Sequence, residues 1–69
     1  MKHQMTYDNR IIFWFDSRRE AQAYCDDLNV FPDQRFEYKP AQLLDPKFAF
    51  RYVIAVRDRE DNNKFFCYY

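Results

Sequence analysis

Side chains that could perform catalysis are few in this chain and poorly spaced for it. Serine, threonine and histidine occur once each, at Ser17, Thr6 and His3. A nucleophilic triad would have to combine Ser17 with His3, which lies in residues 1–9, a segment that we expect to be a frayed N-terminal tail. Zinc takes about four His, Cys or carboxylate ligands, and the chain offers one His and two distant Cys. We therefore predict no enzyme active site, no metal site and no cofactor.

The absence of glycine excludes a second group of chemistries. The chain contains no glycine, although the backbone approaches a phosphate closely at glycine residues in P-loops and dinucleotide-binding turns. The G-x-S-x-G nucleophile elbow is excluded for the same reason. The clustered carboxylates, Asp26-Asp27 and Asp58-Arg59-Glu60-Asp61, lie in segments that we expect on the surface.

Length and charge narrow the class of partner. The 69 residues make a single domain, residues 1–69, and its eleven basic residues balance eleven acidic ones. Nucleic-acid binders usually carry a basic excess, so the charge balance disfavours a nucleic-acid partner. The longest apolar run, Ile11 to Phe15, is far below the roughly 20 residues that span a bilayer. We expect a cytoplasmic protein without a membrane contact, in which Cys25 and Cys67 are free thiols; a Cys25–Cys67 bridge is the alternative.

Hydrophobic periodicity predicts the elements of an α+β domain. Ser17 and Glu20 form a capping-box pattern, and an apolar stripe at helical spacing follows it. Asn29 is expected to end the helix in the left-handed conformation. Residues 40–47, between two prolines, fit either one helical turn or an irregular crossover. We expect strands over residues 10–15, 35–39, 48–57 and 64–69, which give the order β-α-β-β-β, with one helix packed on one face of a mostly antiparallel sheet.

One helix can cover only one face of such a sheet, and we expect the core beneath it to contain Phe13, Tyr24, Leu28, Phe50, Tyr52 and Ile54. The other face would present Ile12, Trp14, Val53 and Ala55, joined either by Phe65, Cys67 and Tyr69 or by Phe66 and Tyr68. Exposed apolar patches usually mark an interface. The alternative is that the N-terminal nine residues, residues 40–47 or sheet curvature hide this face. The predicted interface residues are Ile12, Trp14, Arg51, Val53, Arg57 and Tyr69.

These features favour a small, non-catalytic protein-binding module with an unidentified protein partner, and a homodimer is one form of such binding. Its size resembles that of regulators and inhibitors of larger enzymes encoded by phages or mobile elements, an analogy of size alone. The alternative is a single-stranded nucleic-acid-binding domain in which arginines and aromatic residues of the open face hold the bases, as in RRM-type sheets, although the glycine-containing RNP pattern is absent. A structural subunit of a larger complex is the third hypothesis.

The charges of the predicted helix oppose its dipole. Arg18 and Arg19 lie in the first turn, and Asp26 and Asp27 lie in the last. Such placements cost about 0.3–1 kcal/mol each on an exposed surface. They are either tolerated there or kept for a partner.

Overall fold

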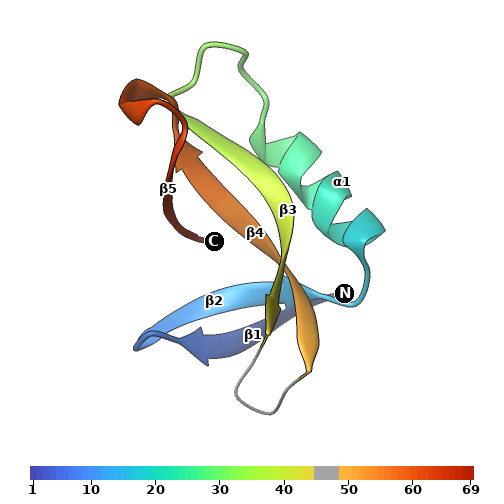
Figure 1. Cartoon of the computed structure of the whole chain (residues 1–69). Coiled ribbons are helices and arrows are strands. Elements are labelled where there is room, and N and C mark those ends of the chain that lie inside the picture. Colours follow the sequence, from blue (N-terminus) through green and yellow to red (C-terminus); the bar gives the residue numbers. More distant parts are fainter. Residues whose placement is uncertain (45–48) are drawn as a thin grey trace.

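The computed structural model describes residues 1–44 and 49–69 and has an α+β architecture, as the sequence predicts (Figure 1). One helix contacts an open, antiparallel, five-stranded sheet. The order differs from the predicted one because a further strand precedes the others. The elements are β1 (Lys2–Tyr7), β2 (Arg10–Phe15), α1 (Arg18–Leu28), β3 (Phe36–Leu44), β4 (Phe50–Asp58), the short 3-10 helix η1 (Arg59–Asp61) and β5 (Lys64–Tyr68).

The extra strand, β1, corrects the expectation that residues 1–9 form a frayed tail. β1 pairs along its whole length with β2, from Lys2 opposite Phe15 to Tyr7 opposite Arg10. The turn between them is Asp8-Asn9, whose φ values are 51° and 62°. Two-residue hairpin turns with positive φ at both positions match the twist of the strands, and Asp and Asn tolerate that conformation. The Asp-Asn pair is therefore the sequence signal that predicts this hairpin.

The helix begins as its capping pattern predicts and ends differently. The Ser17 Oγ accepts a hydrogen bond from the Glu20 N–H at 3.2 Å, and the Glu20 carboxylate accepts one from the Asp16 N–H at 3.1 Å. Asn29 has φ −88°, so the predicted left-handed ending is wrong. Its N–H instead donates to the Cys25 carbonyl at 2.8 Å. This leaves the Asn29 side chain free to reach β3.

The strand predicted over residues 35–39 continues through Pro40 to Leu44 as β3. Residues 40–44 therefore belong to a strand, and the rest of the undecided segment, residues 45–47, lies outside the described residues. Pro40 is opposite Ile54 on β4, and the Ile54 carbonyl accepts a hydrogen bond from the Tyr69 N–H on the other side of β4. Because backbone groups alternate in direction along an antiparallel ladder, Pro40 faces away from β4 and needs no donor there.

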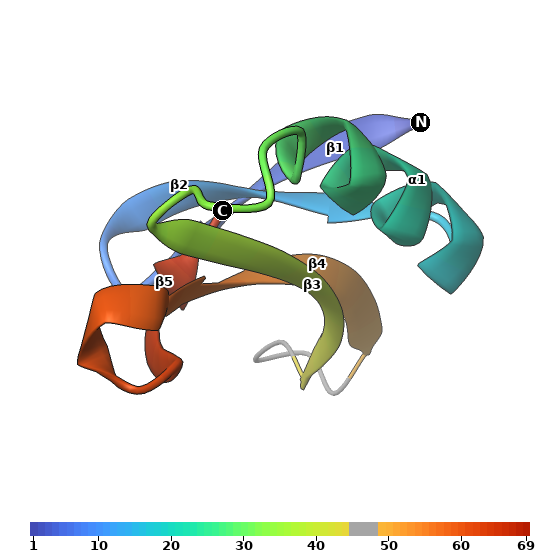
Figure 2. The ribbon, with the colours of Figure 1, turned by 90° about the horizontal axis from the view of Figure 1, so that it is seen from above.

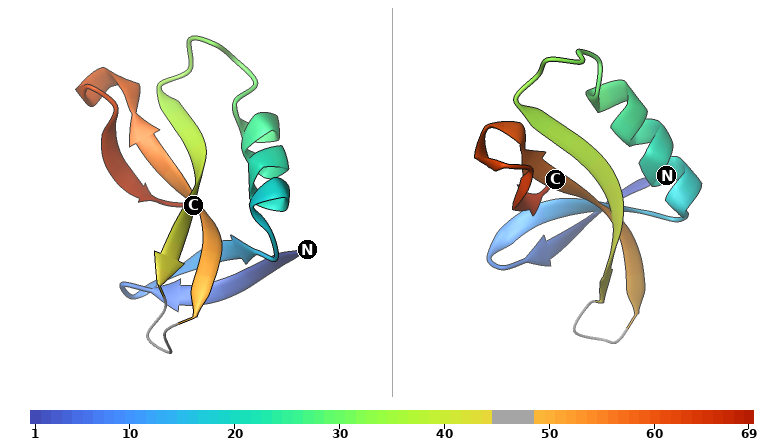
Figure 3. Two further views of the ribbon diagram at one scale, coloured as in Figure 1. Left: turned by 45° about the vertical axis from the view of Figure 1, so that its right-hand side comes forward. Right: turned by 45° about the horizontal axis from the view of Figure 1, so that its top comes forward.

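β4 is the central strand of the sheet. It pairs with β3 along its whole length, and its other edge is shared by β2, at Phe15 and Tyr52, and by β5. α1 packs beside the strongly curved β3–β4 pair, and β5 lies on the opposite side of the molecule (Figure 2). The β1–β2 hairpin crosses the β3–β4 pair at a steep angle (Figure 3).

This crossing creates two small cores, one on each face of the sheet. The first core, under α1, contains Phe15, Ala21, Cys25 and Ile54. Of the core residues that the sequence predicts, Phe13, Tyr24, Leu28 and Tyr52 are partly buried against it, whereas Phe50 is 65% exposed, so that prediction is wrong. The second core, under the hairpin, contains Ile12, Leu43 and Val53. Cys25 and Cys67 are both free thiols, as expected.

Candidate protein-binding surface

The sheet face that the sequence leaves open is covered in the structure. Ile12 is 2% exposed and Val53 is fully buried. Met5 of β1 and Trp14 of β2 pack against them. The expectation of an open apolar face is therefore wrong. As in the alternative interpretation, the face is hidden by Met5 of the first nine residues, by Leu43 of residues 40–47 and by the curvature of the sheet (Figure 3).

The Trp14 ring is covered by the side chains of His3 and Arg51. The His3 ring stacks on it with a centroid separation of 4.0 Å and an interplanar angle of 22°. The Arg51 guanidinium carbon lies 4.3 Å from the Trp14 ring centroid. His3 lies on β1 and Arg51 on β4, the strands on either side of β2, so the two groups approach Trp14 from opposite sides. Neither face of Trp14 is left open for a stacked base.

The two remaining predicted interface residues lie elsewhere. Arg57 donates from Nη1 to the Asn63 carbonyl at 3.2 Å and so belongs to the β4–β5 turn. Tyr69 packs on the α1 side of the sheet, with its ring 5.5 Å from that of Phe13 and 5.8 Å from that of Tyr24. The structure therefore does not bring the six predicted residues together on one surface.

Exposed aromatic side chains gather instead between β5 and the turn of the β1–β2 hairpin. The Tyr68 ring lies 5.4 Å from that of Tyr7 and 4.9 Å from that of Phe65. On the other side of β5, the Phe66 ring lies 5.2 Å from that of Phe36. Phe66 is 60% exposed and Phe65 is 44% exposed. A register shift between Val56 and Arg57 interrupts the alternation and leaves both phenylalanines at the surface.

We call this region the β5 cleft, and it consists of two adjoining hollows. They enclose about 120 and 240 Å³ and share Arg10, Phe66, Cys67 and Tyr68. Small-molecule sites usually enclose about 300–1,000 Å³, so each hollow is nearer the size of an amino-acid side chain. The first is also lined by Tyr7, Asp8, Ile12 and Phe65, and the second by Phe36, Tyr38, Val56 and Tyr69.

An ion pair holds the turn that leads into β5. Arg35 donates from Nε and Nη2 to the two carboxylate oxygens of Asp58, at 3.2 and 3.0 Å. Asp58 also accepts the Glu60 N–H at 3.0 Å, which caps η1. The hydrogen bonds from Arg35 lower the pKa of Asp58 below its usual value. The end of β4 and the turn that leads into β5 are thus tied, through this carboxylate, to the residue that precedes β3.

The two thiols differ in environment. Cys67 is partly exposed and lines both hollows. Cys25 is fully buried in the first core, and burial, with a smaller contribution from Asp26, raises the pKa of its thiol to about 11. Cys67 is therefore the accessible thiol of the pair, and its reactivity can be used to detect occupation of the cleft.

Comparison with known proteins adds no functional information. Comparisons with protein families, curated proteins and solved structures found no match in any of the three. In residues 1–44 and 49–69, no group of three or more His, Cys, Asp or Glu side chains could hold a metal ion. No helix in the same residues is long and apolar enough to cross a membrane. Fold and surface together define a small α+β domain with an aromatic cleft.

Proposed function

We propose that this chain is a non-catalytic protein-binding module whose contact surface is the β5 cleft. The observation that carries the proposal is the group of exposed aromatic side chains around two concave hollows. Aromatic residues are enriched at protein interfaces, where rigid rings fill pockets on the partner or form them. Exposed apolar surface of this kind is otherwise unfavourable in water.

The side chains that could have served catalysis are occupied in other ways. The Ser17 hydroxyl caps α1. His3 Nε2 lies 2.9 Å from the Asp16 carboxylate, and the His3 ring stacks on Trp14. Neither residue lines the β5 cleft. This arrangement supports binding rather than catalysis as the role of the cleft.

Within this class, a regulator or inhibitor of a larger enzyme is the form that we favour, and a homodimer and a structural subunit are the other forms. The single-stranded nucleic-acid hypothesis has less support, because His3 and Arg51 cover the faces of Trp14. A salt titration with labelled oligonucleotides tests that hypothesis, since binding through phosphates weakens steeply as salt rises.

Affinity capture with matched variants tests the proposal. The immobilised chain, a Phe65→Ser/Phe66→Ser variant and a Phe50→Ser variant are each exposed to lysate of the cells that encode the chain. Phe50 is as exposed as Phe66 but lies outside the cleft. We expect a protein that the parent chain and Phe50→Ser retain and that the double variant loses, with circular dichroism showing all three folded. Equal retention by all three, or no retained protein, contradicts the proposal.

A further inference from the structure

We propose that the β5 cleft accepts an extended strand of the partner protein, which pairs with the open backbone edges of β5 and β2 and places an acidic side chain beside Arg10. This inference rests on the proposed function and specifies its partner. Strand addition to an open sheet edge is a common mode of peptide recognition, in which backbone hydrogen bonds provide affinity and side-chain pockets provide specificity.

The first observation is the direction of the backbone groups of β5. The Tyr69 N–H donates to the Ile54 carbonyl at 2.9 Å, and Cys67 is opposite Val56. Alternate residues of a strand direct their N–H and C=O groups to opposite edges. The Tyr69 N–H and the backbone groups of Cys67 therefore face β4, and those of Tyr68 face the cleft.

The edge of β2 opens onto the same space. The Phe13 N–H donates to the Tyr69 carbonyl at 2.9 Å, the only backbone hydrogen bond between β2 and the end of β5 among the described residues. Two positions earlier, the backbone of Ile11 must face the same way. From this single bond β2 and β5 draw apart (Figure 1). Two unpaired edges thus flank the cleft.

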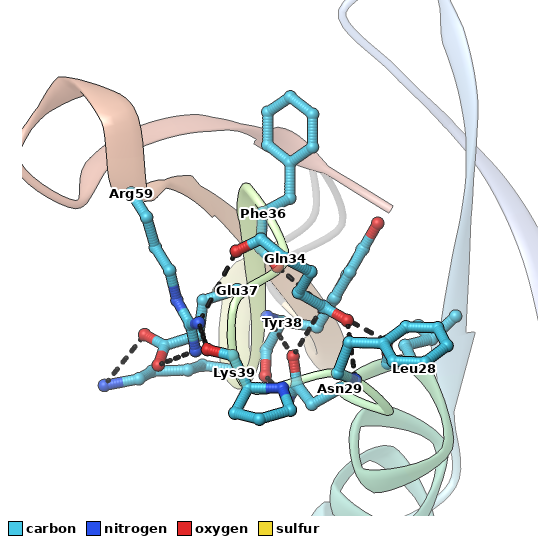
Figure 4. A network of polar contacts seen from close by, with 10 residues as sticks. Leu28, Asn29, Gln34, Phe36, Glu37, Tyr38, Lys39 and Arg59 are labelled. Atoms are coloured by element: carbon cyan, nitrogen blue, oxygen red, sulfur yellow. Dashed lines mark hydrogen bonds and ion pairs between the residues drawn. The ribbon is translucent and has the colours of Figure 1, made fainter.

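The opposite edge of the sheet is closed by contrast. On β3, the Asn29 side chain accepts the Tyr38 N–H at 3.0 Å and donates to the Tyr38 carbonyl at 2.8 Å (Figure 4). Pro40, two residues on, has no N–H to offer. Natural sheets block exposed edges in these ways. The outer edge of β1 is open, but Gln4 and Thr6 line it and neither hollow reaches it.

The two hollows lie where alternate side chains of an added strand would fall. Successive side chains of a strand point to opposite faces of the sheet. The first hollow includes Ile12, which belongs to the second core, and the second includes Tyr38 and Tyr69, which pack against the first core. Odd positions of the added strand would therefore enter one hollow and even positions the other.

Charge indicates the chemistry of the strand. Arg10 is the only cation that lines either hollow, it lines both, and its guanidinium makes no hydrogen bond or ion pair with any described residue. Asp8, the one anion, lines only the first hollow, at the hairpin turn. A carboxylate between two apolar side chains complements this arrangement. A charge-assisted hydrogen bond of this kind is stronger than a neutral one.

A partner strand fits the cleft better than a second copy of this chain does. A twofold dimer brings the same patch of both copies together, so the patch must be self-complementary. Two concave clefts facing each other leave the space between them unfilled. An extended segment fills this space, and its backbone can form hydrogen bonds with the unpaired N–H and C=O groups of β2 and β5.

Selection from a library of random short peptides displayed on phage, with the full chain as the target, tests the inference. We expect selected peptides that alternate β-branched or aromatic residues with polar ones and carry one Asp or Glu. Arg10→Gln should weaken their binding about tenfold, the effect of losing a charge-assisted hydrogen bond, while Arg19→Gln, on the exposed surface of α1, should leave it unchanged. Because an added strand directs alternate N–H groups to β5 and to β2, N-methylation of either alternate set of peptide amides should weaken binding.

Several results would overturn strand addition. They are undiminished binding by either N-methylated series, binding that withstands both Arg10→Gln and Phe65→Ser, and sedimentation showing a dimer of the free chain that Phe65→Ser dissociates. If no peptide is selected although a captured protein depends on Phe65 and Phe66, strand addition fails and the proposed function stands. If capture does not depend on the cleft, the proposed function itself fails.

Discussion

The second core and the β5 cleft are built from the same kinds of residue, yet one is closed and the other is open. Val53 and Ile12 are almost inaccessible, whereas Phe66 is 60% and Phe65 is 44% exposed. The difference comes from where the β1–β2 hairpin lies. It crosses one sheet face and seals it, and its turn stands away from β5. An apolar strand thus predicts either burial in the chain's own core or contact with a partner. The path of the neighbouring strands determines which of the two occurs.

The largest expected effect is the loss of stability on placing a charge in the second core. Val53→Asp places an unpaired carboxylate in the second core, which we expect to cost about 4 kcal/mol or more. A domain of this length has a total stability of about 3–10 kcal/mol, so the variant should be largely unfolded. Val30→Asp is the matched control, since Val30 is 63% exposed. Urea denaturation followed by circular dichroism measures both, and a folded Val53→Asp protein that loses only association would restore the predicted interface.

Two neighbouring isoleucines allow a buried position and an exposed position to be compared by the same substitution. Ile12 lies in the second core, and Ile11, the residue before it, is 66% exposed. Ile12→Ala should reduce the free energy of unfolding by about 2–4 kcal/mol, whereas Ile11→Ala should change it by less than about 0.5 kcal/mol. Equal losses in chemical denaturation would show that the hairpin does not seal this face.

Acidification should loosen the β5 wall through Asp58. Its pKa is lowered by Arg35, so the ion pair stabilises the fold above the unfolded-state pKa of about 3.9 and is lost as pH falls through the lower folded-state value. Asp58→Asn should be less stable than the parent at neutral pH. The difference between the two should shrink below about pH 4, where Asp58 of the unfolded chain takes up a proton, and should be lost once pH falls below the lowered folded-state pKa. A constant difference in denaturation midpoint across this range would contradict this role.

The smallest expected effect concerns α1, on the side of the molecule away from β5 (Figure 2). Arg18 and Arg19 are exposed and make no ion pair with any residue in the described part of the chain. Changing either to Glu should stabilise the isolated domain by about 0.3–1 kcal/mol through the helix dipole. Because these residues lie outside the cleft, partner binding should not change. A slower association rate at low salt would extend the contact surface to α1.

Sequence patterns identified the α+β class because the helix is marked by its own capping box and by apolar residues at helical spacing. The Ser17–Glu20 pattern acts within one turn, so no tertiary information was required. β1 was missed because its six residues are mostly polar and none of them is buried, so no apolar alternation marks the strand. The Asp8-Asn9 turn was the available signal for that hairpin.

The candidate site was harder to predict because it depends on register and topology. The alternation of residues 64–69 allowed two faces, and the irregular pairing at Val56 and Arg57 exposes Phe65 and Phe66 together. Pro40 suggested the end of a strand, yet an edge strand accepts proline wherever its backbone faces outward. Neither feature can be derived from periodicity alone.

Alkylation of Cys67 tests the central claim, that the partner occupies the β5 cleft, most directly. Iodoacetamide is added to the free chain and to its complex with the captured protein, and peptide mass spectrometry follows both thiols. Cys25, buried and with a pKa raised to about 11, should stay unmodified and serve as the internal control for folding. Occupation of the cleft predicts that Cys67 reacts at least about tenfold more slowly in the complex, since only the small unbound fraction exposes its thiolate. An equal rate for Cys67 in the free chain and in the complex would place the partner elsewhere and contradict the account.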